Sequence, residues 1–347
     1  MPSLVLLFGA FPIEAPRTHC IRAAFEGKGN QCVLCHTEAP GFFRKCLDLV
    51  RTYRLLKQDA HTVVVLFPGH HLMPLAWLLT CFPRRRLVFD AFISVHDTLV
   101  SDRRLVARWS PKALFLWIVD FVSCHLADEV ILDTEAHRQF FVRAFHLKPE
   151  RVRVIYLTAR HDLFRPCPRT IKFRLPSPPQ KGEKMDEGGK REIMETMDVF
   201  FFGSFIPLQG ISVILHAAKM LASRTDIYFS LLGSGQTYGA MRKLAEELEL
   251  PNVTFEPWMD LEKLPERICR ADICLGIFGT SAKAARVIPH KVYEAVACGK
   301  PVITMRSPAI LEKFQDGREV ILCEAGNPED LAKKILELTE KLFHLRP

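Results

Sequence analysis

The chain alternates between short apolar runs and segments of helical periodicity. In the first half the apolar runs lie at 4–11, 31–38, 62–69, 86–92, 128–134 and 151–157. Segments such as 42–56 and 110–127, whose apolar residues recur three and four positions apart, separate these runs. Such an alternation of strands and helices predicts a parallel sheet with helices on both faces.

A second series of the same kind follows a break in the pattern. Residues 166–197 are rich in proline, glycine and charge, and we predict that they form a partly mobile linker. After it, apolar runs recur at 199–204, 227–233, 252–258, 272–278, 301–305 and 320–325. The predicted fold is α/β, with two doubly wound, Rossmann-like domains at 1–165 and 198–347 that face each other across a cleft.

One segment of the second half, VIPHKVYEAVACGKPVIT at 287–304, predicts a helix followed by a strand. Pro289 suits the first turn of a helix, and Gly299 suits the position just after its end. Four basic side chains flank the start of this helix: Lys283, Arg286, His290 and Lys291. Because free backbone N–H groups and the helix dipole attract anions, we predict an anion site at this helix start.

Composition and charge are those of a globular protein with a basic first half. The 347 residues are 48% hydrophobic and 25% charged, and the net charge is +8. Residues 1–165 contain 22 Lys and Arg against 15 Asp and Glu. The basic clusters at 83–86 and 102–108 fit an anionic membrane surface or an acidic acceptor, and a solvated face is the alternative. We expect no nucleic-acid partner.

The eleven cysteines occur singly, unlike the dense framework of a small secreted domain, so we expect a reducing compartment. MPSLVLLFGAF lacks the basic region of a signal peptide. No stretch reaches the roughly 18 uncharged apolar residues that span a bilayer. We therefore expect a cytoplasmic protein, possibly peripheral on the inner face of the membrane.

CVLCH at 32–36 matches the pattern for haem attachment, but it falls in a predicted strand. No second pair of zinc ligands stands at a suitable spacing in the sequence. We therefore expect neither a cofactor nor a metal.

Two glycine turns follow predicted strands of the second half. FFGSFIPLQG at 201–210 places Gly203 and Gly210 after one strand, and LLGSGQTYG at 231–239 places Gly233 after the next. Glycine there lets a ligand approach the backbone closely. The second turn misses the dinucleotide-binding fingerprint by one residue, so a structural turn is the better interpretation of that motif alone.

In this order, the motifs resemble those of retaining glycosyltransferases of the GT-B fold, family 4 type (group 1). The resemblance is specific in the second half, where it covers 201–221, 230–235, 252–278 and 287–304. In the first half it is looser and covers 92–99, 128–141 and 151–164. It implies a nucleotide-sugar donor bound by the second domain and a glycan acceptor bound by the first.

The resemblance also implies roles for individual residues. The helix start at Pro289 and His290 would hold the diphosphate of the donor, and Glu294 would accept hydrogen bonds from the ribose hydroxyls. A solvated helix residue is the alternative for Glu294. The other donor-binding candidates are Gly203, Ser204, Gln209, Gly233 and Lys283.

The chain departs from the family pattern at charged positions. Arg286 stands where the family has the first glutamate of its E-x7-E motif, and Ser204 and Gln209 replace an arginine and a lysine. We predict that Lys283, Arg286 and Lys291 supply the missing positive charge, because departure of a nucleoside diphosphate builds negative charge on its phosphates. Exposed surface cations are the alternative interpretation.

His96 is the catalytic candidate of the first half, together with Arg286 and Lys291. It ends a predicted strand and matches a family histidine near the donor sugar, although a structural histidine is the alternative. The predicted function is metal-independent, retaining transfer of a sugar to a lipid-linked, polysaccharide or other glycan acceptor. A sugar-nucleotide epimerase and a non-catalytic sugar-nucleotide-binding partner subunit remain alternatives.

Overall fold

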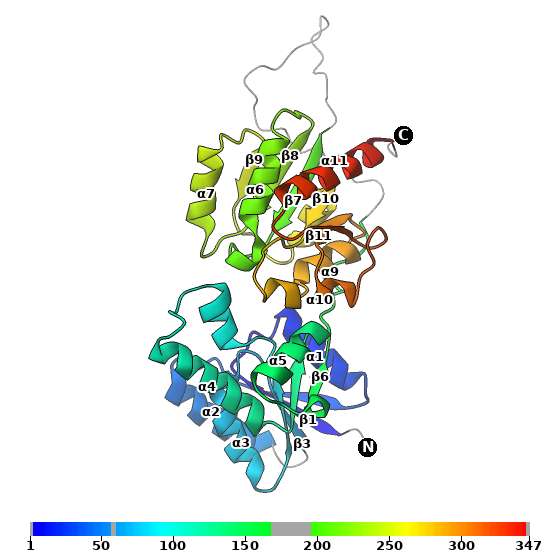
Figure 1. The fold of residues 1–347 in the computed structure, drawn as a ribbon. Coiled ribbons are helices and arrows are strands. Elements are labelled where there is room, and N and C mark those ends of the chain that lie inside the picture. Colours follow the sequence, from blue (N-terminus) through cyan, green and yellow to red (C-terminus); the bar gives the residue numbers. More distant parts are fainter. Residues whose placement is uncertain (1–2, 57–59, 168–195, 345–347) are drawn as a thin grey trace, which may run out of the picture. The chain divides into compact units, whose positions relative to one another are not determined.

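The computed structural model describes residues 3–56, 60–167 and 196–344, which form two compact units. The N-terminal unit consists of Met1–Thr158 with two later segments, Ser281–Ile288 and Pro308–Glu312, and the C-terminal unit comprises the rest. Residues 168–195 of the predicted linker lie outside the described residues. Each unit contains a six-stranded parallel sheet flanked by helices, which confirms the predicted α/β fold of two Rossmann-like domains (Figure 1).

The sheet of the N-terminal unit has the strand order β2-β1-β3-β4-β5-β6. Its strands are β1 (Leu4–Gly9), β2 (Gln31–His36), β3 (Ala60–Val65), β4 (Arg86–Asp90), β5 (Glu129–Leu132) and β6 (Val152–Val154). Alternate residues of β1 bury on opposite faces, with Leu6 and Phe8 in one core and Val5 and Leu7 in the other. Burial on both faces explains why these strands read as continuous apolar runs.

Five longer helices cover this sheet. They are α1 (Pro16–Glu26), α2 (Phe42–Leu56), α3 (Met73–Cys81), α4 (Pro111–Leu126) and α5 (Glu135–Ala144). Helix α1 packs on one face through Ile21 and Phe25, and the other four contribute to the core of the opposite face. A short 3-10 turn, η1 (His70–Leu72), leads into α3.

The C-terminal sheet has the order β12-β11-β10-β7-β8-β9. Its strands are β7 (Met197–Phe202), β8 (Ile227–Leu232), β9 (Val253–Glu256), β10 (Ile273–Leu275), β11 (Val302–Met305) and β12 (Ile321–Cys323). Its helices are α6 (Ile211–Met220), α7 (Tyr238–Glu247), α8 (Leu264–Arg270), α9 (His290–Ala297) and α11 (Pro328–His344). The short elements η5 (Ala284–Arg286) and α10 (Pro308–Leu311) belong to the N-terminal unit.

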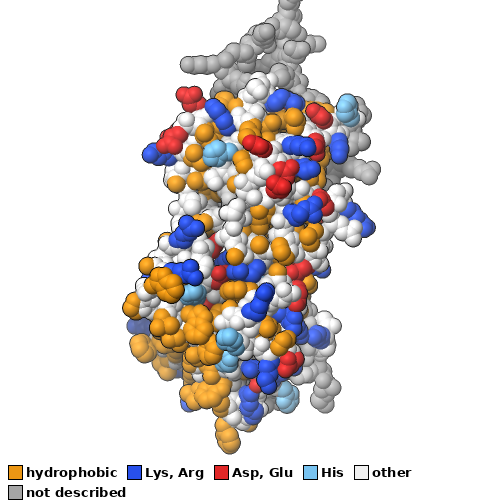
Figure 2. Space-filling view, in the orientation of Figure 1, with side chains coloured by type: hydrophobic (Ala, Val, Ile, Leu, Met, Phe, Trp, Pro, Cys, Tyr) orange, Lys and Arg blue, Asp and Glu red, His pale blue; other side chains and the backbone are white. Residues whose placement is uncertain are grey.

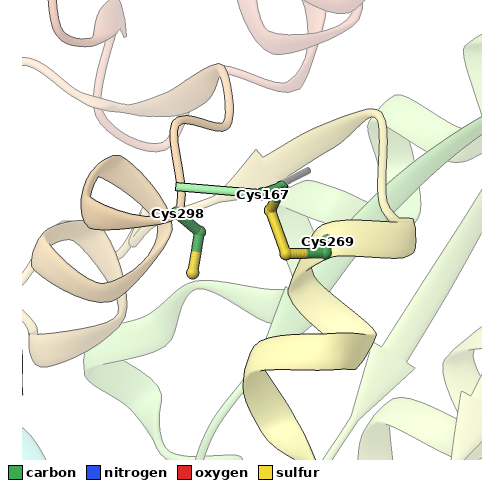
Figure 3. Close-up of side chains that lie close together, drawn as sticks. All are labelled: Cys167, Cys269 and Cys298. Atoms are coloured by element: carbon green, nitrogen blue, oxygen red, sulfur yellow. A yellow bond between two sulfur atoms is a disulfide. The ribbon is translucent and has the colours of Figure 1, made fainter. Parts of the chain in front are cut away.

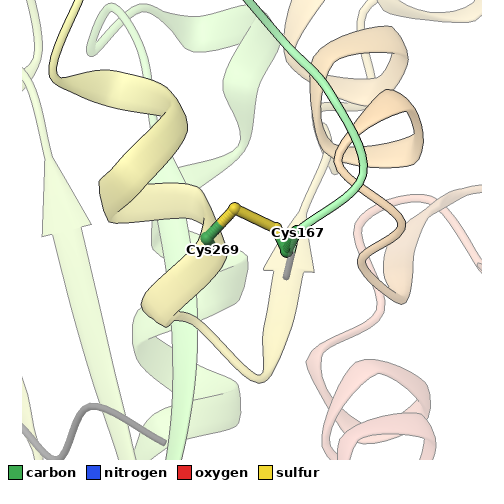
Figure 4. Close-up of a disulfide and its surroundings, with 2 residues drawn as sticks. All are labelled: Cys167 and Cys269. Carbon is green, nitrogen blue, oxygen red and sulfur yellow. A yellow bond between two sulfur atoms is a disulfide. The ribbon is translucent and has the colours of Figure 1, made fainter. Parts of the chain in front are cut away.

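A disulfide joins Cys167 to Cys269 within the C-terminal unit (Figure 4). Cys269 lies in α8, and the thiol of Cys298 at the end of α9 lies within 4.8 Å of the other two sulfur atoms (Figure 3). Sequence spacing did not predict this bond, because its cysteines lie 102 positions apart. The bond is unusual for the reducing compartment that we expected.

The prediction that His96 ends a strand is wrong. Strand β4 ends at Asp90, and His96 belongs to a helical turn that leads into a π-helix, η2 (Asp97–Asp102). The physical reason is the carboxylate of Asp120, which accepts hydrogen bonds from the backbone N–H groups of Val95 and His96 at 3.0 and 2.9 Å. These are donors that the start of a helix leaves unpaired.

The helices in the described ranges are not membrane-spanning helices. None of them combines the length and the apolar composition that crossing a bilayer requires.

Candidate functional site

The candidate site of the C-terminal unit lies at the carboxyl ends of its central strands. The strand order reverses between β7 and β10, and ligands of open parallel sheets bind at such a switch point. The loops that follow these two strands meet there. A Cβ on Gly210 would lie 2.5 Å from the backbone nitrogen of Gly279, so only glycine allows this approach.

The two predicted glycine turns pack against each other. Gly203 and Gly233 have φ values of +136° and +139°, and a Cβ on Gly233 would lie 2.0 Å from the carbonyl oxygen of Gly203. Gly203 in turn faces Lys291, whose Nζ would lie 3.0 Å from an added Cβ. The turn after β7 is therefore fitted closely to the next turn and to a side chain of α9.

Helix α9 starts and ends as its proline and glycine predict. Pro289 is its N-cap residue, and Gly299 follows its C-cap with a φ of +72°. His290, the first residue of the helix, is half-buried. The predicted helix at 289–298 is thus confirmed to within one residue at each end.

Lys291 places a cation under the turn after β7. Its Nζ donates a hydrogen bond of 2.7 Å to Oε1 of Gln209 and lies 3.5 Å from the ring centre of Phe201. The side chain is buried, and burial lowers the pKa of Lys291 well below its usual range. One amide and one aromatic face are modest compensation for a buried ammonium, so an anion here would stabilise its charged form.

Glu294 lies one turn further along α9 and is only 6% exposed. Burial raises its pKa from 4.5 to about 7, and the positive charge of Lys291 opposes part of this rise. Within the described part of the chain, no group donates a hydrogen bond to its carboxylate. A buried carboxylate without hydrogen-bond donors suits a ligand that brings hydroxyl groups.

The remaining donor-binding candidates divide between the two units. Ser204 is exposed in the turn after β7, whereas Gln209 is buried and holds Lys291. Lys283 and Arg286 fall in the segment that belongs to the N-terminal unit. The structure therefore brings Gly203, Gln209 and Lys291 together beside Gly233, in the unit that also holds Glu294. The two other predicted cations belong to the N-terminal unit.

Within the N-terminal unit, both of these cations have partners on the π-helix η2. Lys283 Nζ donates to the hydroxyl of Thr98 at 2.6 Å, and Arg286 pairs with the carboxylate of Asp97 at 2.6 Å. The guanidinium of Arg286 also lies 3.9 Å from the ring centre of Phe140. Their predicted role as phosphate-binding cations stays a prediction.

Sequence reasoning missed Asp120, which organises the loop that carries His96. Besides the two backbone N–H groups, its carboxylate accepts a hydrogen bond of 2.6 Å from Ser94, and His70 Nε2 lies 3.5 Å away. Burial raises the pKa of Asp120 and lowers that of His70 to about 4. The signal in the sequence was a single carboxylate in an otherwise apolar helix, which is rare without buried partners.

A cavity of about 490 Å³ adjoins this loop. Its lining is mainly apolar and includes Phe67, Ile93, Leu99 and Phe115, with Arg103 as a charged member. Phe67 comes just after β3 in the sequence, and Ile93 comes just after β4. The cavity therefore lies at the carboxyl ends of these strands, which is the usual ligand side of such a sheet.

Comparisons with known proteins show which family the second half of the chain matches. Residues 196–341 match the family described as Glycosyl transferases group 1. The MMP alpha-(1->4)-mannosyltransferase of Mycolicibacterium hassiacum is 21% identical over 75% of this chain and 59% of its own length. The D-inositol 3-phosphate glycosyltransferase of Streptomyces bingchenggensis is 25% identical over 61% of this chain and 45% of its own length. The chain thus spans about half the length of these two relatives.

Solved structures resemble the chain along almost all of its length. Anabaena HepE, in complex with UDP and glucose, has a TM-score of 0.66 at 16% identity, covering 98% of this chain and 90% of that one. Sucrose-phosphate synthase of Thermosynechococcus elongatus has a TM-score of 0.69 at 15% identity, covering 97% and 90%. At such identities the likeness shows the fold, which is the GT-B fold. Residues 196–341 of this chain therefore match the group 1 glycosyltransferase family, in a chain with the GT-B fold.

Proposed function

We propose that the chain is a retaining, metal-independent glycosyltransferase. It moves a sugar from a nucleotide-sugar donor to a lipid-linked, polysaccharide or other glycan acceptor. The observation that carries this proposal is the buried pair of Lys291 and Glu294 on α9, beside the glycine turn after β7. Opposite charges one turn apart match a ligand that presents phosphate oxygens next to hydroxyl groups.

In this proposal the donor diphosphate lies at the start of α9. Lys291 and the free backbone N–H groups of the first turn neutralise the charge that builds on the leaving phosphate. A phosphate there would also stabilise the protonated form of Lys291, against the effect of burial. Because the chain supplies this cation itself, we expect the reaction to need no metal ion.

Glu294 accepts hydrogen bonds from the two ribose hydroxyls. Its ionised oxygens are acceptors only, so they match two hydroxyl donors and would reject a ribose that lacks them. Anabaena HepE has been crystallised with UDP and with UDP-glucose, so uridine nucleotides are the first probes for this site.

Transfer with retention proceeds on one face of the sugar. The bond between the anomeric carbon and the phosphate oxygen breaks, and the acceptor oxygen forms its bond from the same side. The departing phosphate takes the proton of the acceptor hydroxyl. We assign acceptor binding to the N-terminal unit, with its apolar cavity and with His96 in the turn that Asp120 fixes.

We also propose a cytoplasmic location, peripheral on the inner face of the membrane. The basic charge of the first half supports attraction to anionic lipid. The Cys167–Cys269 disulfide provides the test, because disulfides are rare in reducing compartments. Thiol alkylation before lysis, followed by mass spectrometry, should find both cysteines alkylated; an intact bond in cells would contradict the location.

Thermal shift with UDP-, GDP- and ADP-sugars tests donor binding, and nucleotide release with candidate acceptors tests transfer. We expect Lys291→Met to weaken donor binding about 10- to 100-fold, because a charged hydrogen bond to phosphate is lost. Lys263→Met, which removes an exposed lysine of the same unit, is the matched control. Unchanged binding by Lys291→Met would refute the site, and loss of turnover with a metal chelator would refute metal independence.

A non-catalytic donor-binding subunit is the second candidate. It is favoured by Ser204 and Gln209, which replace the cations of the family pattern, and by the engagement of Arg286 with Asp97. Donor binding without nucleotide release, across a panel of acceptors, would select this candidate over the enzyme.

A further inference from the structure

Three helices of the N-terminal unit form one continuous outer face. Helices α2, α3 and α4 lie side by side over the same side of the sheet (Figure 1). The hydroxyl of Tyr53 in α2 donates a hydrogen bond of 2.9 Å to the carbonyl oxygen of Leu79 in α3, and α3 packs on α4. We call the outer side of these helices, with the loops at 82 and 105–109, the apolar face.

The apolar face exposes large hydrophobic side chains to an unusual extent. Its members are Phe42, Phe43, Leu47, Leu55, Trp77, Leu78, Phe82, Leu105, Trp109, Leu114, Phe115, Ile118 and Val122. Phe43, Phe82 and Trp109 are 85%, 94% and 89% exposed. Figure 2 shows the corresponding cluster of hydrophobic side chains over this part of the unit. Contiguous apolar patches of this kind mark interaction surfaces.

Helix α4 shows that this exposure is built into the sequence. Its inner side buries Ala113, Leu116 and Cys124, while Leu114 and Ile118 point outward on the opposite side. A surface helix in water normally carries polar residues on its outer side. A helix that is apolar all round needs an apolar partner on both sides, and the sheet provides only one.

The exposed charges in the loop before α4 and at the start of that helix are basic. Between 60 and 126 the sequence has four carboxylates, Asp90, Asp97, Asp102 and Asp120, and all four are buried. Among the exposed bases of the same span, Arg84 and Arg86 pair with Asp128 and Glu129, which lie just beyond it. Arg104, Arg108 and Lys112 are also exposed and lie in the loop before α4 and at the start of that helix. The partner of this face is therefore apolar in its centre and anionic around it.

We propose that the apolar face docks on the surface of an anionic lipid bilayer. Its aliphatic and aromatic side chains enter the acyl boundary, while the flanking arginines and Lys112 meet lipid phosphates. Trp77 and Trp109 lie on the face with indole rings, which favour the depth of the headgroups. The guanidinium of Arg108 lies 5.2 Å from the ring centre of Trp109, so one charged and one aromatic anchor act at the same place.

Charge decides between the bilayer and two other occupants. A second copy of the chain docked through the same face would bring the exposed arginines of both copies together, which is unfavourable. An acidic protein would satisfy the charges, but its surface would have to match thirteen projecting hydrophobic side chains. A fluid bilayer adapts to such a surface without matched pockets.

Flotation of the full chain with lipid vesicles tests the proposal. Vesicles of phosphatidylcholine with about one third phosphatidylglycerol should bind the chain, and phosphatidylcholine alone should bind it at least about tenfold more weakly. Raising the salt from about 0.1 M to about 0.5 M should weaken binding to the anionic vesicles. The assay needs neither donor nor acceptor, so its outcome is independent of the proposed transfer reaction.

Two variants separate the apolar from the electrostatic contribution. Trp109→Ser with Ile118→Ser should lower vesicle binding about tenfold or more, whereas Trp258→Ser, which removes a 66% exposed tryptophan of the C-terminal unit, should not change it. Arg104→Gln with Arg108→Gln should lower binding about fivefold for each lost cation and reduce its salt dependence.

Three outcomes would overturn the proposal. The first is equal binding to neutral and anionic vesicles, and the second is unchanged binding by the Trp109 and Ile118 double variant. The third is a dimer in light scattering that disappears in that variant, which would show that a second copy covers the face. Trp109 is 89% exposed and Ile118 is 43% exposed. The melting temperature of the double variant is therefore measured beside the flotation, and a value close to that of the wild type confirms that the variant is folded.

Discussion

Glu294 should make the ligand-free protein less stable as the pH rises, and the size of this effect follows from its burial. Its pKa is 4.5 in an exposed setting and about 7 in the folded chain. The folded state thus keeps the proton to a higher pH than the unfolded state does. The contribution of Glu294 to the stability of the fold is therefore greatest below pH 4.5 and is lost as the pH rises to about 7. The difference between the two pKa values corresponds to about 3 kcal/mol.

Glu294→Gln isolates this contribution, because the amide keeps the shape of the side chain and does not ionise. At pH 8 the free energy of unfolding of the ligand-free variant should exceed that of the wild type by up to about 3 kcal/mol. Near pH 4.5 the two should agree. Calorimetry or denaturant unfolding of the full chain at pH 4.5, 6 and 8 measures the difference. Glu262→Gln, which changes an exposed carboxylate of the same unit, should show no such trend.

The same substitution should lower donor binding while it raises stability. An amide is a weaker acceptor than a carboxylate, so we expect uridine nucleotides to bind about 10- to 100-fold more weakly. A variant that is less stable than the wild type at pH 8 would refute the reasoning, because the ionised carboxylate would then have a stabilising partner in the fold. A variant that is more stable but binds UDP normally would refute the ribose role alone.

Three further changes test other parts of the C-terminal unit. Lys291→Met should stabilise the ligand-free chain at pH 7, since burial lowers the pKa of that amine, and unfolding curves would show a higher midpoint. Gly233→Ala should cost more than about 2 kcal/mol or prevent folding, whereas Gly299→Ala, which has a positive φ but open space around it, should cost about 1 kcal/mol in the same assay. Cys269→Ser should lower stability by about 2 to 4 kcal/mol, and reductant should then leave the melting temperature of the variant unchanged.

The helices and strands of this chain could be predicted well from its sequence. The helix expected at 42–56 is α2, and the one expected at 289–298 is α9, because periodicity and the pair of Pro289 and Gly299 are local signals. All twelve expected strands exist within the described residues. Both faces of each sheet are covered, so each strand is a continuous apolar run that stands out from its surroundings.

Partners distant in sequence could not be predicted in this way. The residue that fixes the turn of His96 is Asp120, 24 positions later, and it accepts from backbone N–H groups that any residue would offer. Gln209 looked like the loss of a family cation, yet it is the hydrogen-bond acceptor for Lys291, 82 positions away. Periodicity carries no information on which polar groups meet when the strands and helices assemble.

The candidate site could nevertheless be predicted from the sequence, because two charged residues stand among the apolar residues of α9. Lys291 and Glu294 stand among Val292, Tyr293 and Ala295 on a helix that buries all five. A buried ammonium and a buried carboxylate cost stability unless something pairs with them, and in this fold each has little or no protein partner. Such an arrangement is favourable when a ligand with phosphate and hydroxyl groups completes it, so the instability of the empty site and its affinity for a nucleotide have the same physical cause.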